Sequence, residues 1–204
     1  MKKMKIWLKI TVFITAFLCC FGLLSCSEDK TGKHEFQKNM LSDFSAQVDF
    51  LVDFSGNPVA GKAEVTKSRT LRIDIDSPDP FSGISVECDM AGNPGVVSIS
   101  YSGIKAEVPK AAMEKFLFLM NMMSEETALQ LEKQGKGSYK PCEEMYVSED
   151  FPEAVPYEVR LSYDNTEYIF IYDSITGIPL EIFADNGECK AEIKVRELKT
   201  ANKE

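Results

Sequence analysis

Histidine is nearly absent from this sequence, because His34 is the only one among 204 residues. A serine–histidine–aspartate or cysteine–histidine catalytic arrangement would have to use that single residue. The cysteine spacings match no zinc pattern, and no G-x-S-x-G, phosphate-loop or dinucleotide-binding motif occurs. We therefore expect no enzymatic activity, no cofactor and no metal site.

Basic residues are also scarce, with 23 Lys and Arg against 32 Asp and Glu and a formal net charge of −9. An acidic chain repels the phosphate backbone, so nucleic acid is excluded as a partner. The same charge argues against a body that lies flat on anionic lipid. The charge balance does not identify a partner.

The longest apolar run is too short to span a membrane. Lys9 and Ser25 bracket only 15 residues without charge, whereas a spanning helix needs about 20. Four lysines precede or begin this run, and no acidic residue occurs before Glu28. A cationic head, an apolar middle and a small residue at its end are typical of a secretory signal peptide.

The residues that end this run, Leu23-Leu24-Ser25-Cys26, resemble the lipobox of bacterial lipoproteins. That resemblance implies cleavage before Cys26 and acylation of its thiol. Two or three acyl chains would hold the protein at the membrane, since one chain alone binds only marginally. The alternative is an ordinary signal peptide whose run merely contains a cysteine.

The expected organisation is a signal peptide at 1–25, a lipidated cysteine and tether at 26–42, and a single domain at 43–204. Cleavage would remove four lysines and no acid, which takes the net charge from −9 to −13. The protein would be lipid-anchored to the bacterial cell membrane and face the extracytoplasmic side. Its body would keep Cys88, Cys142 and Cys189, an odd number that allows at most one internal disulfide.

From residue 44 onward, apolar and polar residues alternate in a way that predicts β-strands. In the first segment, Phe44 to Phe54, every second residue is apolar and Leu51 is the exception. The turns Ser102-Gly103 and Asp185-Asn186-Gly187 favour hairpins. Ten strands are expected, at 44–54, 61–67, 70–76, 84–90, 96–101, 104–108, 157–163, 167–173, 178–184 and 188–198.

The period changes to that of a helix between Pro109 and Met123. Pro109 suits the first turn of a helix, and a stripe of apolar residues at helical spacing follows it. A second, polar helix is expected from Glu125 to about Gly135. Sequential hairpins with one apolar face predict a curved sheet whose concave side needs a cover, and the helix at 109–123 is the candidate.

The signal and lipobox, "LRIDIDSPDPFSG", "VSISYSG" and "YDSITGIPLEIFADNG" together resemble the bacterial lipoprotein-localisation fold of LolA and LolB. The resemblance covers most of residues 44–198 in order and spacing. It implies an α+β fold: a strongly curved antiparallel sheet, or unclosed barrel, of about ten strands with a helical lid over the concave face. It also implies an apolar hollow that receives acyl chains.

We therefore expect a lipid or another apolar ligand to bind under the helical lid, with a possible role in lipid or lipoprotein transfer. Methionine adapts to ligands of irregular shape. Plain core packing explains any single residue of the helix better, and it explains the stripe as a whole equally well. The alternative function is an anchored sensor or adaptor that binds a protein partner and carries no lipid. The expected ligand-binding residues are Phe50, Val52, Leu71, Ile73, Met113, Phe116, Leu117, Met120 and Met123.

Two groups of acidic residues lie close together in the sequence. Asp74, Asp76 and Asp79 do not follow the calcium-loop pattern, because Pro78 interrupts them, so they are expected to form a solvated strand face. Glu143, Glu144, Glu149, Asp150 and Glu153 are expected to form a solvated loop that could dock a basic partner.

Overall fold

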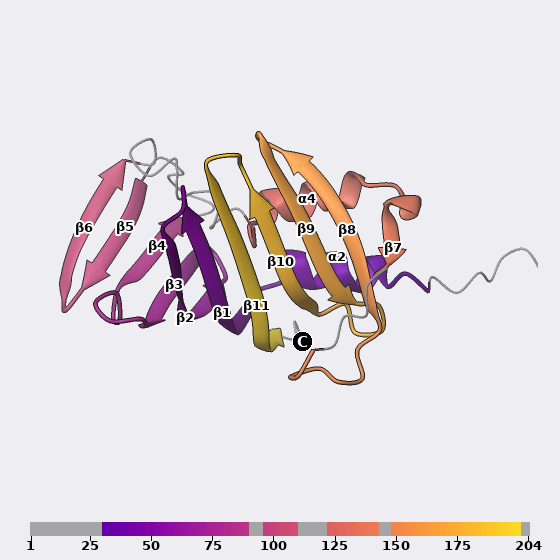
Figure 1. Cartoon of the computed structure of the whole chain (residues 1–204), viewed down its shortest axis with the longest axis horizontal. Helices are drawn as coiled ribbons and strands as arrows, with labels where there is room; N and C mark the ends of the chain where they lie inside the picture. The colour runs from indigo at the N-terminus through magenta and orange to yellow at the C-terminus, as the bar shows by residue number, and fades with distance from the viewer. Residues whose placement is uncertain (1–29, 90–95, 110–121, 143–147, 201–204) are drawn as a thin grey trace, which may run out of the picture. The chain divides into compact units, whose positions relative to one another are not determined.

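Eleven antiparallel strands form one sheet (Figure 1). The computed structural model describes residues 30–89, 96–109, 122–142 and 148–200. The strands are β1 Phe44–Phe54, β2 Pro58–Lys67, β3 Thr70–Ser77, β4 Ser85–Asp89, β5 Val96–Tyr101, β6 Ile104–Pro109, β7 Tyr139–Pro141, β8 Pro156–Tyr163, β9 Thr166–Asp173, β10 Pro179–Asp185 and β11 Cys189–Thr200.

The spatial order is β6-β5-β4-β3-β2-β1-β11-β10-β9-β8-β7. Two meanders, β1–β6 and β7–β11, are therefore joined where β1 pairs with β11, from Phe44 opposite Thr200 to Phe54 opposite Cys189. Among the described strands β6 and β7 are the two edges and do not pair with each other. The sheet is consequently unclosed, as the sequence predicted.

Tight turns set the register of the hairpins. Ser102 and Gly103 have φ of 49° and 81°, and Asp164 and Asn165 have φ of 51° and 56°. Two successive residues with positive φ form the type I′ turn, whose twist matches that of the flanking strands. The Ser102-Gly103 turn was expected from the sequence, and it pairs Tyr101 directly with Ile104.

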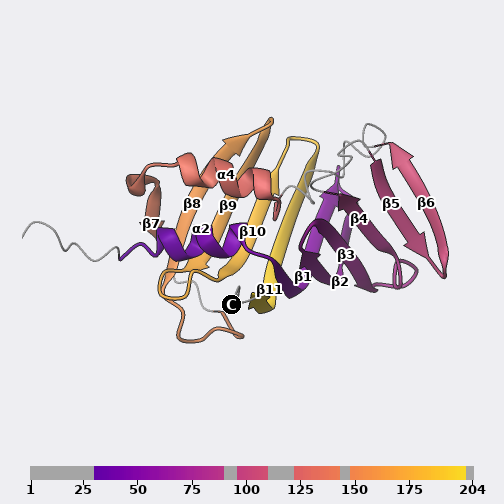
Figure 2. The same cartoon turned by 180° about the vertical axis from the view of Figure 1, so that it is seen from behind.

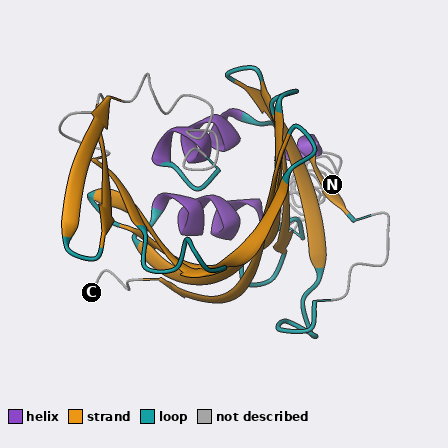
Figure 3. Cartoon of the chain, turned by 60° about the vertical axis from the view of Figure 1, so that its left-hand side comes forward, coloured by secondary structure: helices purple, strands orange, loops and turns teal. Residues whose placement is uncertain are grey.

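Within the described ranges, two α-helices lie on one side of the sheet, α2 at Lys33–Leu41 and α4 at Glu125–Lys133. Figure 2 shows both helices in front of the strands of the second meander. Figure 3 shows the strands bending around them. A short 3-10 helix, η2 at Lys136–Ser138, connects α4 to β7.

Helix α4 confirms the second expected helix. The Ser124 hydroxyl accepts a hydrogen bond from the Thr127 N–H and so caps its first turn. Pro109, expected to begin the first helix, is instead the last residue of β6, opposite Val96. Proline is tolerated there because β6 is an edge strand and needs no further backbone donor on its outer side. The rest of that expected helix, up to residue 121, lies outside the described residues.

Helix α2 and strand β7 were not expected. Helix α2 lies within the stretch treated as a tether, and only Phe36 and Met40 bring apolar side chains from it into the core. Strand β7 has three residues, too few for an alternating pattern. Both elements form because tertiary packing supplies the stability that their own sequences lack.

Candidate functional site

One face of the sheet is apolar across all eleven strands. On β1, Phe44, Ala46, Val48 and Val52 are buried and point to it. Strand pairing extends this face to the neighbouring strands, because directly paired residues point to the same side of the sheet. One row across the first meander holds Val65, Ile73, Val86, Ile99 and Ala106. We call this side of the sheet the apolar face.

Helix α2 packs on the apolar face of the second meander. The ring of Phe36 stacks on that of Tyr172, with centroids 4.3 Å apart, and lies 5.9 Å from that of Phe170. The amide nitrogen of Gln37 donates hydrogen bonds to the Leu131 carbonyl at 3.0 Å and to the Tyr139 hydroxyl at 2.9 Å. These contacts hold α2, α4 and β7 together.

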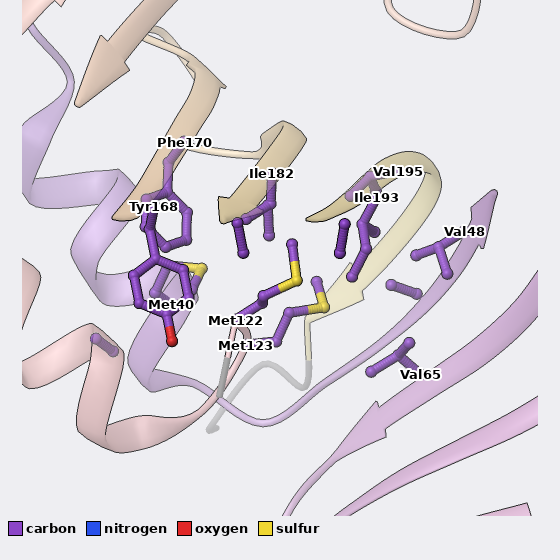
Figure 4. Packing of buried hydrophobic residues seen from close by; sticks show 14 of the residues in the cluster. Met40, Val48, Val65, Met122, Met123, Tyr168, Phe170, Ile182, Ile193 and Val195 are labelled. Carbon is purple, nitrogen blue, oxygen red and sulfur yellow. The ribbon is translucent and has the colours of Figure 1, made fainter. Parts of the chain in front are cut away.

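Met122 and Met123 cover the middle of the apolar face. Both side chains are almost fully buried, and Figure 4 shows them pointing toward Ile182 and Ile193. They lie in the turn that precedes α4 rather than in a helix. Met123, an expected ligand-binding residue, therefore lies among core side chains.

Burial decreases along the strands of the first meander, from the buried row Leu71, Cys88 and Val97 to the row beside it. Ile73, Val86 and Ile99 are half-buried and pack against the core, while Tyr101 and Ile104 are 50% and 73% exposed. All five side chains belong to the apolar face, because they pair in phase with its buried residues. We call Ile73, Val86, Ile99, Tyr101 and Ile104 the open patch.

The structure brings four of the expected ligand-binding residues to one face. Phe50 and Val52 lie on β1, and Leu71 and Ile73 lie on β3. Val52 and Leu71 are buried, whereas Phe50 and Ile73 are half-buried. Cys26, Met113, Phe116, Leu117 and Met120 lie outside the described residues. Val86 and Ile99 lie on the same face and were not among the expected residues, although their alternation within β4 and β5 carries the same signal.

One lysine interrupts the apolar face. Lys67 is 4% exposed, its ammonium donates a hydrogen bond to the Met40 carbonyl at the end of α2, and it lies 5.8 Å from the centre of the Phe44 ring. Burial lowers the pKa of Lys67, and this effect outweighs the attraction of Glu125 and Asp43. A cation at the carboxyl end of a helix is favourable, so Lys67 anchors α2 to β2.

The opposite face of the sheet is charged and internally paired. Arg72 binds Asp74 through two hydrogen bonds of 2.7 Å, and this pairing lowers the pKa of the Asp74 carboxyl. Arg196 on β11 bonds to Asp49 on β1 and to Asp150 in the acidic loop. Within the described ranges, no group of three metal-ligating side chains is close enough to hold a metal ion.

The three cysteines in the described part of the chain, Cys88, Cys142 and Cys189, form no disulfide bond. Cys88 and Cys189 are buried on the apolar face, as the strand pattern predicts. Burial raises the pKa of Cys142 to about 11, and Glu158 and Glu181 add to the effect. A thiol with a raised pKa is a poor nucleophile at neutral pH.

Among the described helices, none has the length and apolarity that crossing a bilayer requires.

No protein-family model matches the sequence, and no curated protein matches it. Solved structures similar to this chain include an uncharacterised conserved protein from Thermus thermophilus, with a TM-score of 0.46, 14% identity, and coverage of 83% of this chain and 85% of that one. A LolA superfamily protein from Nitrosomonas europaea has a TM-score of 0.39, 7% identity, and coverage of 87% and 95%. The lipoprotein LppX from Mycobacterium tuberculosis has a TM-score of 0.44, 7% identity, and coverage of 83% and 94%.

Proposed function

We propose that this protein is a lipid-anchored bacterial lipoprotein of the extracytoplasmic side that binds a lipid or another apolar ligand against its open patch. The observation that carries the proposal is the gradient of burial along the apolar face. Ile73, Val86 and Ile99 stay half-buried in three neighbouring strands, and Tyr101 and Ile104 beyond them are exposed. Covering such a surface with an acyl chain removes apolar area from water on both partners.

The driving force would be burial alone. Each Å² of apolar surface removed from water contributes about 25 cal/mol, and the patch offers no charged group that would fix one particular headgroup. An acyl chain could then leave one apolar site for another without a chemical step. Met113, Phe116, Leu117 and Met120 are proposed to contact the same ligand.

The proposal is tested by a matched pair of lysine substitutions on β5. Ile99→Lys places a charge within the open patch, whereas Ser98→Lys places the same charge on the opposite face, beside Glu87 and Glu107. Each variant and the parent are purified identically, and lipids in organic extracts are quantified by mass spectrometry. We expect Ile99→Lys to lose most of its bound lipid and Ser98→Lys to keep it.

Lipid that co-purifies in detergent micelles should be equal in all three samples. The difference in lipid content between the variants and the parent therefore reports on the site. Circular dichroism and thermal unfolding establish that Ile99→Lys is folded. Equal lipid in the parent and in folded Ile99→Lys would contradict the proposed site. A folded Met120→Trp variant with unchanged lipid uptake would exclude Met120 from it.

The anchor is tested separately. Cys26→Ser removes the thiol that would be acylated, so the protein should move from the membrane to the soluble fraction on ultracentrifugation. Retention of the variant in the membrane would show that Cys26 is not the attachment point. This outcome would leave the ligand site open, because the two experiments use different readouts.

The alternative function, an anchored adaptor without lipid cargo, is supported by the packing of Met122 and Met123. These side chains already fill the middle of the apolar face, which reduces the area left for a ligand. The lysine pair on β5 separates the two functions, because an adaptor would carry no lipid in the parent or in either variant.

A further inference from the structure

We infer that two copies of this chain pair through their β6 edges and form a two-fold symmetric dimer. β6 has one partner strand among the described residues, β5. Five of its six residues are exposed, and Val108 is half-buried. An exposed edge presents unpaired N–H and C=O groups that bind another strand. The dimer requires neither the proposed anchor nor the proposed ligand.

The hairpin fixes which backbone groups are free. Tyr101 and Ile104 flank a two-residue turn, so this pair exchanges both hydrogen bonds and the bonded pairs alternate from there. Ile104, Ala106 and Val108 thus bond inward to β5. Lys105 and Glu107 direct their N–H and C=O groups outward, to the free side of the edge.

The sequence of β6 is complementary to itself in one antiparallel register. When Ala106 of one copy faces Ala106 of the other, Lys105 of each lies opposite Glu107 of its partner. These are the residues with free backbone groups, so each Lys105–Glu107 pair would form two backbone hydrogen bonds and juxtapose opposite charges. Opposite charges in cross-strand pairs stabilise a sheet.

The neighbouring registers are disfavoured. Shifting the partner by two residues in one direction sets Lys105 against Lys105, and shifting it in the other direction sets Glu107 against Glu107. The second shift also places Lys105 opposite Pro109, which has no N–H to donate. A one-residue shift would bring outward-directed groups opposite inward-directed ones. Only the register centred on Ala106 satisfies both the hydrogen bonds and the charges.

This register also covers the most exposed large apolar side chain of the described residues. Ile104 is 73% exposed, and in the dimer it lies opposite Val108 of the partner on the apolar face. The two-fold axis passes through the sheet between the two Ala106 residues, so both apolar faces lie on the same side. The opposite edge, β7, cannot pair in this way, because it has three residues and ends in Pro141.

Charge exchange tests the inference with matched variants. Lys105→Glu would set two glutamates against each other in both pairs, and Glu107→Lys would set lysine against lysine. We expect either change to weaken dimerisation at least about tenfold, measured by analytical ultracentrifugation of the detergent-solubilised protein at physiological salt. The double variant Lys105→Glu/Glu107→Lys restores opposite charges and should restore the dimer. Mixing the two single variants should give a heterodimer.

Disulfide capture tests the register. Ala106→Cys brings the two thiols together across the axis, where Cα atoms of a non-hydrogen-bonded pair are about 4.5 Å apart, within the range that a disulfide spans. Under mild oxidation this variant should run as a covalent dimer, whereas Lys105→Cys should not. A parent that remains monomeric, a folded Lys105→Glu variant that still dimerises, or capture by Lys105→Cys rather than Ala106→Cys would overturn the inference.

Discussion

Asp173 holds the turn between β9 and β10 through one buried carboxylate. It accepts hydrogen bonds from the N–H groups of Val155, Ile175 and Thr176 at 2.9–3.2 Å and from the Thr176 hydroxyl at 2.6 Å. Burial alone would raise the pKa of Asp173, but these donors together outweigh it, so the pKa lies below the usual value of 3.8.

Asp173→Asn turns one acceptor into a donor that faces other donors, and we expect it to destabilise the fold by about 2 kcal/mol at pH 7. Because the folded-state pKa is lowered, the stabilisation is present above the unfolded value and is lost as pH falls below about 4. Urea unfolding of both proteins at several pH values checks this. The two should converge at low pH, and a gap independent of pH would contradict the role of the charge.

Glu181 shows the opposite behaviour. It is 5% exposed, and burial, helped by the neighbouring Glu192, raises its pKa to about 7 against the attraction of Lys194. The charged form is therefore costly in the folded state. Stability should fall as pH rises from about 4.5 through 7, by up to about 3 kcal/mol.

Glu181→Gln removes this titration. We expect the variant to be more stable than the parent at pH 8 and close to it at pH 5, in urea unfolding curves. Glu197→Gln is the matched control, because it removes an acidic side chain from the neighbouring strand β11, where Glu197 lies in an exposed pair with Lys199. An unaltered slope in Glu181→Gln would show that another group titrates.

At the scale of elements, α2 is docked to the β9–β10 turn by close backbone approach. A Cβ on Gly177 would lie 2.4 Å from the Glu35 carbonyl carbon and the Phe36 nitrogen, and Gly177 has a φ of +70°. Asn39 adds a hydrogen bond to the Thr176 carbonyl at 3.0 Å. The turn therefore leaves room for the helix only because residue 177 has no side chain.

Gly177→Ala should destabilise the protein more than Gly187→Ala does. Gly187 has a similar φ of +83° but nothing within 4 Å of an added Cβ, so its substitution costs only the backbone strain of about 1 kcal/mol. Gly177→Ala must in addition displace α2, so we expect a loss of at least about 2 kcal/mol. Thermal unfolding of both variants checks this, and equal losses would show that α2 moves away freely.

The sequence predicted those elements whose own pattern decides their structure. β1 alternates over eleven residues, with Leu51 as the exception, and the structure exposes Leu51 on the charged face. Helix α2 was not predicted because its two buried apolar residues, Phe36 and Met40, are too few to define an apolar helix face. Its stability depends on packing such as the stacking of Phe36 on Tyr172, which the sequence does not reveal. The burial of Lys67 was not predicted either, because its hydrogen-bond partner is the Met40 carbonyl at the end of that helix.

For the candidate site, the sequence predicted which face each residue occupies but not how deeply it is buried. Strand phase was enough to place Phe50, Val52, Leu71 and Ile73 on one face, because alternation fixes orientation. It could not reveal how deeply each residue is buried, which depends on what covers the face. Met122 and Met123 therefore appear as core residues next to Ile182 and Ile193, and the open patch extends to Val86 and Ile99 on strands whose short patterns gave no such gradient.

For the whole molecule, the strand order places β1 and β11, the first and last strands along the chain, next to each other in the interior of the sheet. β1 and β11 pair over their length, each with a further strand on its other side, whereas β6 and β7 are edges among the described strands. Local opening is easiest where few contacts must break. We expect hydrogen exchange to be slowest in β1 and β11 and fastest in β6 and β7.

The dimer adds a dependence on protein concentration that is confined to β6. In dilute protein, the amides of Lys105 and Glu107 face solvent and should exchange fast, while that of Ala106 is bonded to β5 and should exchange more slowly. At concentrations that favour the dimer, Lys105 and Glu107 should become protected and Ala106 should change least, because its amide is already bonded. In Lys105→Glu, the same protection should appear only at protein concentrations at least about tenfold higher. Protection of Ala106 in place of its two neighbours would mean that the partner strand meets β6 in another register, because amide direction alternates along a strand.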